Sequence, residues 1–368
     1  MYQVTFKGLE NVIFEFSPIA FTIPGFSFEM FGKTFTFAEK PMYWYGIIIA
    51  VGMILSAAYA FYRAKKFGIK ADHMYDYAIF AIIFGVIGAR LYYVLTNLEM
   101  YDSFKEAIAI WNGGLAIYGG VIGGAITVFV ISKIKKINPF TVLDAVAPSV
   151  MIGQAIGRWG NYMNQEAFGG NTTLPWGMRS TVPGGPAGLT GTVEYLERHY
   201  NELLARGIEV DPTGYVHPTF LYESLWNVTG FIIIHFLYKK RTFKGEMVLM
   251  YLTWYGLGRG FIEMLRTDSL YIPGTNIRIS SLFGFICFFL GLAAIIYMKL
   301  RVKKHPQVLE CAATEGACDT EPDDSTVTPE EIEELCAIDG AENAEFPSEA
   351  AESADETETE GGENGDTD

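Results

Sequence analysis

One short stretch of this sequence places several chemically active side chains at the end of an apolar segment. The stretch is GQAIGRWGNYMNQEAFGG, residues 153–170, and it contains Arg158, Asn161 and Glu166. A charged side chain at the centre of a bilayer costs about 2.5–3.5 kcal/mol on insertion scales. Because that cost must be offset, such residues are usually retained to bind or react with something. The stretch therefore predicts a functional site at a membrane.

Two later stretches add charges of both signs. HPTFLYE spans residues 217–223, and YGLGRGFIEMLR spans residues 255–266. Arg259 and Glu263 are four residues apart, so they share one face of a helix and are expected to form an ion pair. Together with the first stretch, these charges indicate a polar cavity that holds an anion. Arginine binds phosphate through two parallel hydrogen bonds, and the abundant phosphate of a bilayer belongs to lipid head groups.

For three further polar side chains, the sequence is compatible with either a structural or a functional role. Tyr45 lies in YWYG, where an aromatic belt at the membrane surface is the simpler interpretation. Arg90 lies in GVIGARLYY and needs a partner from another helix or from a lipid phosphate. Tyr118 lies in GGLAIYGGVIGG, whose glycines are spaced for close helix packing. A tyrosine hydroxyl that is buried needs a hydrogen-bond partner.

Seven apolar segments are long enough to cross a bilayer, which takes about 20 residues of helix. They lie near residues 42–62, 75–96, 114–132, 140–158, 219–238, 246–265 and 280–299, of which the fourth is expected to be the least apolar. Lysine and arginine clusters follow the first, third, fifth and seventh segments, and the positive-inside rule places such clusters in the cytoplasm. The sequence predicts an all-α polytopic membrane protein with seven transmembrane helices, an outer N-terminus and a cytoplasmic C-terminus.

Other regions are predicted around these helices. Residues 1–41 are expected at the membrane interface, and the alternation in FSFEMFGKTFTF predicts a short hairpin there. Residues 42–304 form the membrane domain, with a small extracytoplasmic head inserted at about 161–217 that contains a helical pattern, VEYLERHYNELLARG. Residues 305–368 are acidic and poor in apolar residues, which predicts a disordered cytoplasmic tail.

The charge distribution excludes some classes of function. The chain has a net charge of −15, but residues 1–304 contain all 27 lysines and arginines and only 20 of the 42 acidic residues, which gives them a charge of +7. Their basic residues form short clusters between apolar runs, so nucleic-acid binding is not expected. The four cysteines show no CxxC pair and no Cys/His spacing for a metal.

The polar motifs occur in the order typical of a known family. GRWGNYMNQEAFG, residues 157–169, resembles the signature of the prolipoprotein diacylglyceryl transferases, and HPTFLYE and YGLGRGFIEMLR resemble two more of its motifs. YWYG, GARLYYVL and WNGGLAIYGG match others, so the resemblance covers about residues 40–300. It implies a multi-pass enzyme of the cytoplasmic (inner) membrane that transfers the diacylglyceryl group of phosphatidylglycerol to the lipobox cysteine of a preprolipoprotein signal peptide. A thioether forms and glycerol phosphate leaves.

The resemblance also implies which residues form the site. It points to Tyr45, Arg158, Asn161, Glu166, Gly169, Tyr255 and Arg259, and further to Asn164, Glu263 and Arg266. We predict that Arg158, Arg259, Tyr45, Asn161, Glu166, Tyr255 and Tyr118 are catalytic, and that Arg158, Arg259, Asn164, Gly169, Glu263 and Arg90 bind phosphatidylglycerol. The two essential arginines, Arg158 and Arg259, would neutralise the charge of the leaving phosphate. The thiol nucleophile arrives with the substrate, no metal or cofactor is needed, and a monomer is expected.

Two positions depart from the family pattern. Tyr118 stands where many members have a histidine that is proposed as the base, and tyrosine, with an unperturbed pKa of about 10, is a poor base at neutral pH. Either the family histidine is not a general base, or another group replaces it here: Tyr118 as a hydrogen-bond donor to the phosphate, or Glu166 as the base. Phe220 stands where the family often has glutamine, which removes one hydrogen bond.

Two other classes of function stay open. A transporter of anionic lipids or solutes would bind an anion with the same arginines and release it unchanged, although no internal repeat is apparent. A non-catalytic scaffold would recruit partners with the acidic tail. The number of polar motifs within apolar segments favours the enzyme.

Overall fold

Long α-helices form most of the structure. The computed structural model describes residues 1–31, 33–101, 103–183, 189–272 and 274–304, and the predicted disordered tail, residues 305–368, lies outside the described residues. The long helices are α1 (Trp44–Lys66), α2 (Ala71–Thr96), α4 (Ile117–Lys135), α5 (Pro139–Asn164), α7 (Thr219–Leu237), α8 (Glu246–Leu265) and α9 (Ile279–Lys304). Each coincides with one predicted apolar segment.

Six of these helices are long and apolar enough to cross a membrane, within the part of the chain that the structure describes. The helix outside this group is α8, which is interrupted by Arg259 and Glu263. Averaged over its whole length, α5 is the least apolar of the long helices in the described residues, which agrees with the expectation for the fourth segment. The chain is a multi-pass membrane protein.

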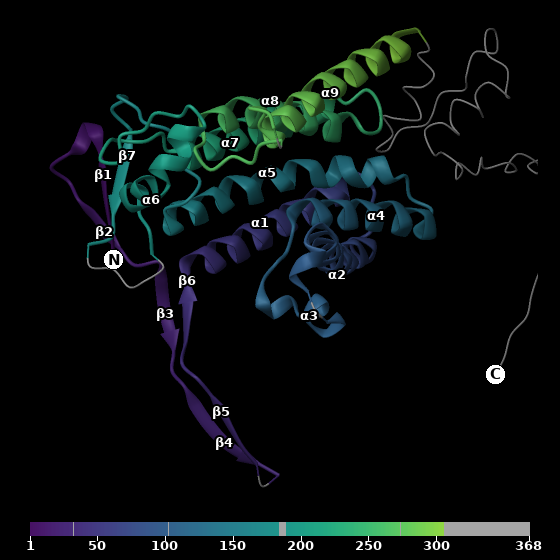
Figure 1. Cartoon of the computed structure of the whole chain (residues 1–368). Helices are drawn as coiled ribbons and strands as arrows, with labels where there is room; N and C mark the ends of the chain where they lie inside the picture. The colour runs from purple at the N-terminus through teal and green to yellow at the C-terminus, as the bar shows by residue number, and fades with distance from the viewer. Residues whose placement is uncertain (32, 102, 184–188, 273, 305–368) are drawn as a thin grey trace, which may run out of the picture.

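Helix α5 is the central helix of the bundle. It packs against α1, α7, α8 and α4, and α1, α5, α7, α8 and α9 run side by side (Figure 1). Asn138 caps its first turn through a hydrogen bond to the backbone N–H of Phe140, and Pro139 occupies the first position. The helix ends at Asn164, and the next residue, Gln165, caps it in a left-handed conformation with φ 53°. The motif from Arg158 to Asn164 is therefore helical, six residues beyond the predicted end.

Close packing joins α2 to α4, as the glycine spacing predicts. A Cβ atom on Gly119 would overlap the carbonyl oxygen of Gly88, and one on Gly123 would overlap that of Phe84. Gly124, in contrast, has open space around it. The prediction is confirmed for Gly119 and Gly123 because these two glycines face the other helix.

A small sheet and a helix, partly from the predicted head segment, lie at one end of the bundle (Figure 1). The three-stranded sheet has the order β2 (Phe14–Phe16), β1 (Tyr2–Phe6), β7 (Met178–Thr181), with antiparallel neighbours. Helix α6 (Thr192–Ala205) confirms the predicted helical pattern and contributes Leu196 and Leu203 to the head core. The first strands of the chain therefore belong to the same sheet as a strand of the predicted head insertion.

A two-stranded β-ribbon extends from the start of α1. Strand β3 (Ile19–Ile23) pairs with β6 (Lys40–Tyr43), and β4 (Phe26–Met30) pairs with β5 (Lys33–Phe37), which confirms the predicted hairpin. The prediction of an all-α protein holds for the membrane helices, whereas the strands of the head and of the ribbon add β-structure. Both lie at the end of the bundle away from the last residues of α9 (Figure 1).

The remaining short elements lie in the connections. They are η1 (Lys7–Leu9), η2 (Leu98–Met100), α3 (Phe104–Ile108), η3 (Ile110–Asn112) and η4 (Tyr238–Lys240). Three of them, η2, α3 and η3, form the connection between α2 and α4, which bears on Arg90 below.

Candidate functional site

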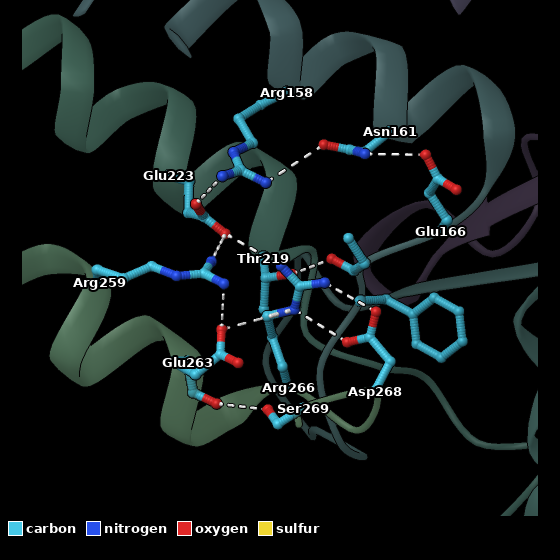
Figure 2. Close-up of polar contacts among 12 residues, drawn as sticks. Arg158, Asn161, Glu166, Thr219, Glu223, Arg259, Glu263, Arg266, Asp268 and Ser269 are labelled. Atoms are coloured by element: carbon cyan, nitrogen blue, oxygen red, sulfur yellow. Dashed lines mark hydrogen bonds and ion pairs between the residues drawn. The ribbon is translucent and has the colours of Figure 1, made fainter. Parts of the chain in front are cut away.

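The carboxylate of Glu223, on α7, lies at the centre of a cluster of arginines (Figure 2). Its Oε2 lies 2.6 Å from Nη2 of Arg158 on α5, and its Oε1 lies 3.5 Å from Nη1 of Arg259 on α8. Nη1 of Arg266, directly after α8, lies 3.8 Å from the same Oε1. Glu223 is 6% exposed, so water screens these contacts little. Three helices thus bring three guanidinium groups to one anion.

Two further carboxylates balance the arginines. Oε2 of Glu263 lies 2.7 Å from Nη2 of Arg259, which confirms the predicted ion pair between residues four apart. Asp268 accepts two hydrogen bonds from Arg266, of 2.9 Å from Nε and 2.7 Å from Nη2. Burial lowers the pKa of Arg266, but the hydrogen bonds and charge of Asp268 outweigh burial, so the net shift is upward and the guanidinium stays charged. The cluster is therefore a neutral set of three arginines and three carboxylates.

A row of amides connects Arg158 to Glu166 (Figure 2). Arg158 donates from Nη1 to Oδ1 of Asn161 at 3.4 Å, and Asn161 donates from Nδ2 to Oε1 of Glu166 at 2.9 Å. Asn164 donates to the same oxygen of Glu166 at 3.4 Å. Glu166 itself is exposed. Two amides orient a carboxylate that solvent can reach, and this geometry suits the exchange of a proton with an incoming group.

A cavity of about 1,090 Å³ opens beside this row. Tyr45, Asn164, Glu166 and Asp268 line it, so predicted residues from two separate motifs meet there. The ring of Tyr45 packs against α5, because a Cβ atom on Gly160 would lie 2.9 Å from its Cδ2. Cavities of this order of size hold drug-sized ligands, so there is room for more than a free phosphate.

Gly169 positions the ends of three helices through its backbone. Its N–H donates to the carbonyl of His217 at 2.9 Å, and it forms an isolated antiparallel bridge with Arg266. A Cβ atom there would lie 2.7 Å from Cβ of His217 and 2.9 Å from the carbonyl oxygen of Leu265. Only glycine allows the loop after α5 to lie against the start of α7 and the end of α8. Its contribution to the site is therefore this close approach of backbones.

Two of the predicted residues are tyrosines on α8 and α4. Tyr255, one turn before Arg259 on α8, is within electrostatic range of Arg158 and of Tyr118. Tyr118 lies in the first turn of α4, is 38% exposed, and packs edge-to-face against Phe283 of α9 at 6.2 Å. The structure thus places Tyr255 near the arginines and Tyr118 near Tyr255.

Arg90 lies apart from the other predicted residues. Its Nε donates to the carbonyl of Ala107, its Nη2 to that of Glu106, both at 2.8 Å, and its Nη1 to those of Gly113 and Gly114 at 2.5 and 2.9 Å. These carbonyls belong to the connection between α2 and α4. The partner that the sequence leaves open is therefore backbone, and a contact between Arg90 and phosphatidylglycerol stays a prediction.

Known proteins resemble this chain over most of its length. The model of the family described as prolipoprotein diacylglyceryl transferase matches residues 33–297. A phosphatidylglycerol–prolipoprotein diacylglyceryl transferase of Lysinibacillus sphaericus (strain C3-41) is 39% identical over 272 residues, which cover 73% of this chain and 93% of the relative. A protein of the same name from Staphylococcus aureus (strain Newman) is 40% identical over 260 residues, covering 70% and 85%. Its counterpart in Staphylococcus haemolyticus (strain JCSC1435) is 40% identical over 269 residues, covering 73% and 88%.

The chain belongs to the prolipoprotein diacylglyceryl transferase family. The resemblance based on its motifs is thereby confirmed. In this transferase, the sequence placed Glu223 among the charges of the polar cavity without identifying its arginine partners, and it gave no role to Asp268, which follows Arg266 by two residues. The sequence did not reveal the arginine that each carboxylate binds. Neither carboxylate binds an arginine three or four residues away on the same helix, so helical spacing alone did not identify the partners.

Phe220, where the family often has glutamine, packs among aromatic rings in this transferase. It is 3% exposed, and its ring centroid lies 4.8 Å from that of Tyr162 and 5.5 Å from that of Trp159. Phe220 thus contributes aromatic packing beneath the α5 motif in place of the hydrogen bond that a glutamine would make.

Proposed function

We propose that the chain is a membrane enzyme that transfers the diacylglyceryl group of phosphatidylglycerol to the lipobox cysteine of a preprolipoprotein signal peptide. Membership of the family supports the reaction, and the names of the relatives specify phosphatidylglycerol and prolipoprotein. The observation that carries the proposal is the convergence of Arg158, Arg259 and Arg266 on the buried carboxylate of Glu223. Guanidinium groups arranged around one anion also suit a phosphate diester.

The lipid phosphate would share or replace the contacts that Glu223 makes. Glu223 holds Arg158 closely at 2.6 Å but Arg259 only at 3.5 Å, so the second arginine is the easier one for a phosphate to reach. Glu263 keeps Arg259 in position from the other side at 2.7 Å. As the leaving phosphate gains charge, both arginines stabilise it in a place that water screens little.

The reaction forms one bond and breaks one. The sulfur of the substrate cysteine bonds to the glyceryl carbon, the bond from that carbon to the phosphate oxygen breaks, and glycerol phosphate leaves with the electron pair. The thiol proton must pass to a base, because the thiolate is the nucleophile. Glu166, exposed at the cavity and oriented by Asn161 and Asn164, is our candidate for that base. Tyr118 would orient the lipid head group through its hydroxyl.

The same proposal includes the topology. We count α8 as a seventh span, because Arg259 and Glu263 neutralise each other within it. Basic clusters follow α1, α4, α7 and α9, so these ends are cytoplasmic under the positive-inside rule. The segment of residues 1–41 and the head at about 161–217 then face outward, and the site lies in the outer half of the inner membrane. We propose a monomer as the active form.

A reconstituted assay tests the reaction. Purified protein in phosphatidylglycerol nanodiscs receives a lipobox peptide, and glycerol phosphate and lipidated peptide are measured together. Wild type should form both in equal amounts, whereas Arg158→Ala and Arg259→Ala should form neither. Arg206→Ala is the matched control, because Arg206 pairs with Glu202 on the surface of α6 and should keep full activity.

The assay also separates the enzyme from a transporter. Movement of phosphatidylglycerol across vesicle membranes without glycerol phosphate, under conditions in which a known transferase works, would contradict the proposal.

A further inference from the structure

The β-ribbon, residues 19–43, has one apolar face and one polar face at its outer part. In the pairing of β4 with β5, Phe26 lies opposite Phe37 and Phe28 opposite Phe35. These four rings stack on one another, with centroid distances of 4.9 Å and 5.5 Å across the two pairs. They therefore share one face.

The other face is made of small polar side chains and one acid. Ser27 lies opposite Thr36, and Glu29 lies opposite Thr34. Alternation along a strand sends these residues to the side away from the rings. The outer part of the ribbon is therefore amphipathic. This property suits a position at an interface between water and an apolar phase.

Nothing in the described chain covers the apolar face. Phe26 is 56% exposed, Phe28 41%, Phe35 40% and Phe37 49%, and Phe31 at the tip is 93% exposed. An uncovered patch of this size on a protein marks an interaction site. The question is which partner covers it.

The placement of the ribbon indicates the partner. It leaves the bundle at the start of α1 and runs across the direction of the helices, away from the bundle (Figure 1). The backbone N–H of Trp44, the first residue of α1, donates to the carbonyl of Pro18 just before β3, at 2.9 Å. The ribbon thus begins where α1 enters the membrane and extends along the plane of its surface. Further along α1, Met53 and Ile54 are 60% and 67% exposed, as expected for a helix side that faces lipid.

We propose that the phenylalanine face of the β-ribbon lies on the outer-leaflet phospholipid beside the protein. Its occupant is the bilayer itself, held by aromatic side chains that favour the membrane interface. The ribbon is then a membrane-lying arm attached to the transferase.

The base of the arm gives it a further role, which rests on the proposed function. Ile19, Pro41, Met42 and Tyr43 line the same cavity as Glu166. The outer part of the arm lies on the lipid, and its base forms part of the cavity wall. The arm therefore provides an apolar surface that connects the lipid to the cavity. It would guide phosphatidylglycerol from the leaflet to the site.

Fluorescent labels on the two faces test the docking without reference to activity. In full-length protein with Cys287, Cys311, Cys318 and Cys336 replaced by serine, a single cysteine is introduced by Phe35→Cys or by Thr36→Cys. These neighbours on β5 lie on opposite faces, so each controls for the other. After labelling with an environment-sensitive fluorophore and reconstitution in phosphatidylglycerol nanodiscs, emission and quenching by lipids with a nitroxide near the head group are measured.

The label at position 35 should show blue-shifted emission and strong quenching, and the label at position 36 should show neither. Equal behaviour of the two labels would overturn the proposal. A blue shift at position 35 without lipid quenching would overturn it in favour of a second copy of the chain. A shift that occurs only after addition of a lipobox peptide would overturn it in favour of substrate binding.

Two variants test the guiding role. Replacing Phe26, Phe28, Phe35 and Phe37 by serine should lower the rate several-fold in nanodiscs and leave it unchanged in detergent micelles, where lipid needs no path along a leaflet. The matched control replaces Ser27, Thr34 and Thr36 by alanine and should keep the rate in both. An unchanged rate in nanodiscs, or an equal loss in micelles, would overturn the guiding role. If the labels report docking on lipid but the wild-type protein has no transferase activity, the proposed function has failed and the docking proposal still stands.

Discussion

Arg90 and Arg158 are both arginines within apolar helices, yet different kinds of group neutralise them. Arg90 gives its N–H groups to backbone carbonyls in residues 106–114, in four hydrogen bonds. Arg158 gives its N–H groups to side chains, the carboxylate of Glu223 at 2.6 Å and the amide of Asn161 at 3.4 Å. Both arrangements satisfy the hydrogen bonds of a cation within the helix bundle.

The two kinds of partner differ in what they allow next. A carbonyl in a folded connection cannot move away without unfolding that connection, whereas a carboxylate or an amide can leave by rotation of its side chain. Arg158 can therefore exchange its partner for a phosphate, but Arg90 cannot do so without loss of structure. An arginine in a membrane helix is thus a candidate for ligand binding mainly when its partners are side chains.

The largest effect is expected from Arg158→Lys. Lysine keeps the charge but loses the planar fork that reaches Glu223 and Asn161 at once. We expect kcat/KM to fall by about 100- to 1,000-fold, the usual cost of one charge-stabilising donor, with little change in the unfolding temperature. Steady-state kinetics and thermal unfolding in nanodiscs measure the two quantities. Arg206→Lys is the control, and equal losses in both variants would show that the fork of Arg158 is not special.

Arg90→Met should have the opposite profile. It preserves the length of the side chain but leaves the carbonyls of the connection without a donor, so we expect about 2–4 kcal/mol of lost stability. The fraction that stays folded should keep kcat/KM within a few-fold of wild type. Denaturant unfolding and the activity of freshly purified protein give the two values. Loss of activity with unchanged stability would instead support the predicted contact of Arg90 with lipid.

This comparison also explains which features the sequence could predict. Hydropathy located all seven long helices, and spacing within one helix predicted the pair of Arg259 and Glu263. Alternation within one segment predicted the hairpin of β4 and β5. Each of these features depends on residues that are close along the chain.

The features that were missed depend on distant residues. Glu223 is 65 residues from Arg158 and 36 from Arg259, and three helices must pack before the contacts exist. The pairing of β1 with β7 joins residues of the predicted N-terminal segment to the head. The carbonyls that hold Arg90 carry no sequence signal, because every residue has one. Sequence thus indicates that a buried charge needs a partner without identifying that partner.

A smaller effect is expected at Tyr118, at the edge of the site. If its hydroxyl orients the head group, Tyr118→Phe loses one hydrogen bond to a charged group, and kcat/KM should fall about tenfold. Tyr118→His, which retains a donor, should keep most of the activity. Rates with the lipobox peptide and binding of phosphatidylglycerol are measured side by side. Complete loss in Tyr118→Phe with lipid binding intact would assign the proton transfer to Tyr118 and not to Glu166.

No effect on catalysis is expected from the most highly charged part of the chain. Residues 306–368 contain 22 acidic residues, many more than the site, but the proposed topology places them on the cytoplasmic side. The inner half of a hydrocarbon core of about 30 Å lies between them and Glu223 with its arginines, and salt screens charges in water beyond about 8 Å. Deletion of residues 306–368 should leave kcat/KM within twofold, measured in nanodiscs at low and physiological salt. A salt-dependent change in rate would place the tail near the site and contradict the topology. The expectation of no effect follows because the arginines respond to the carboxylates that contact them, and not to the total number of acidic residues in the chain.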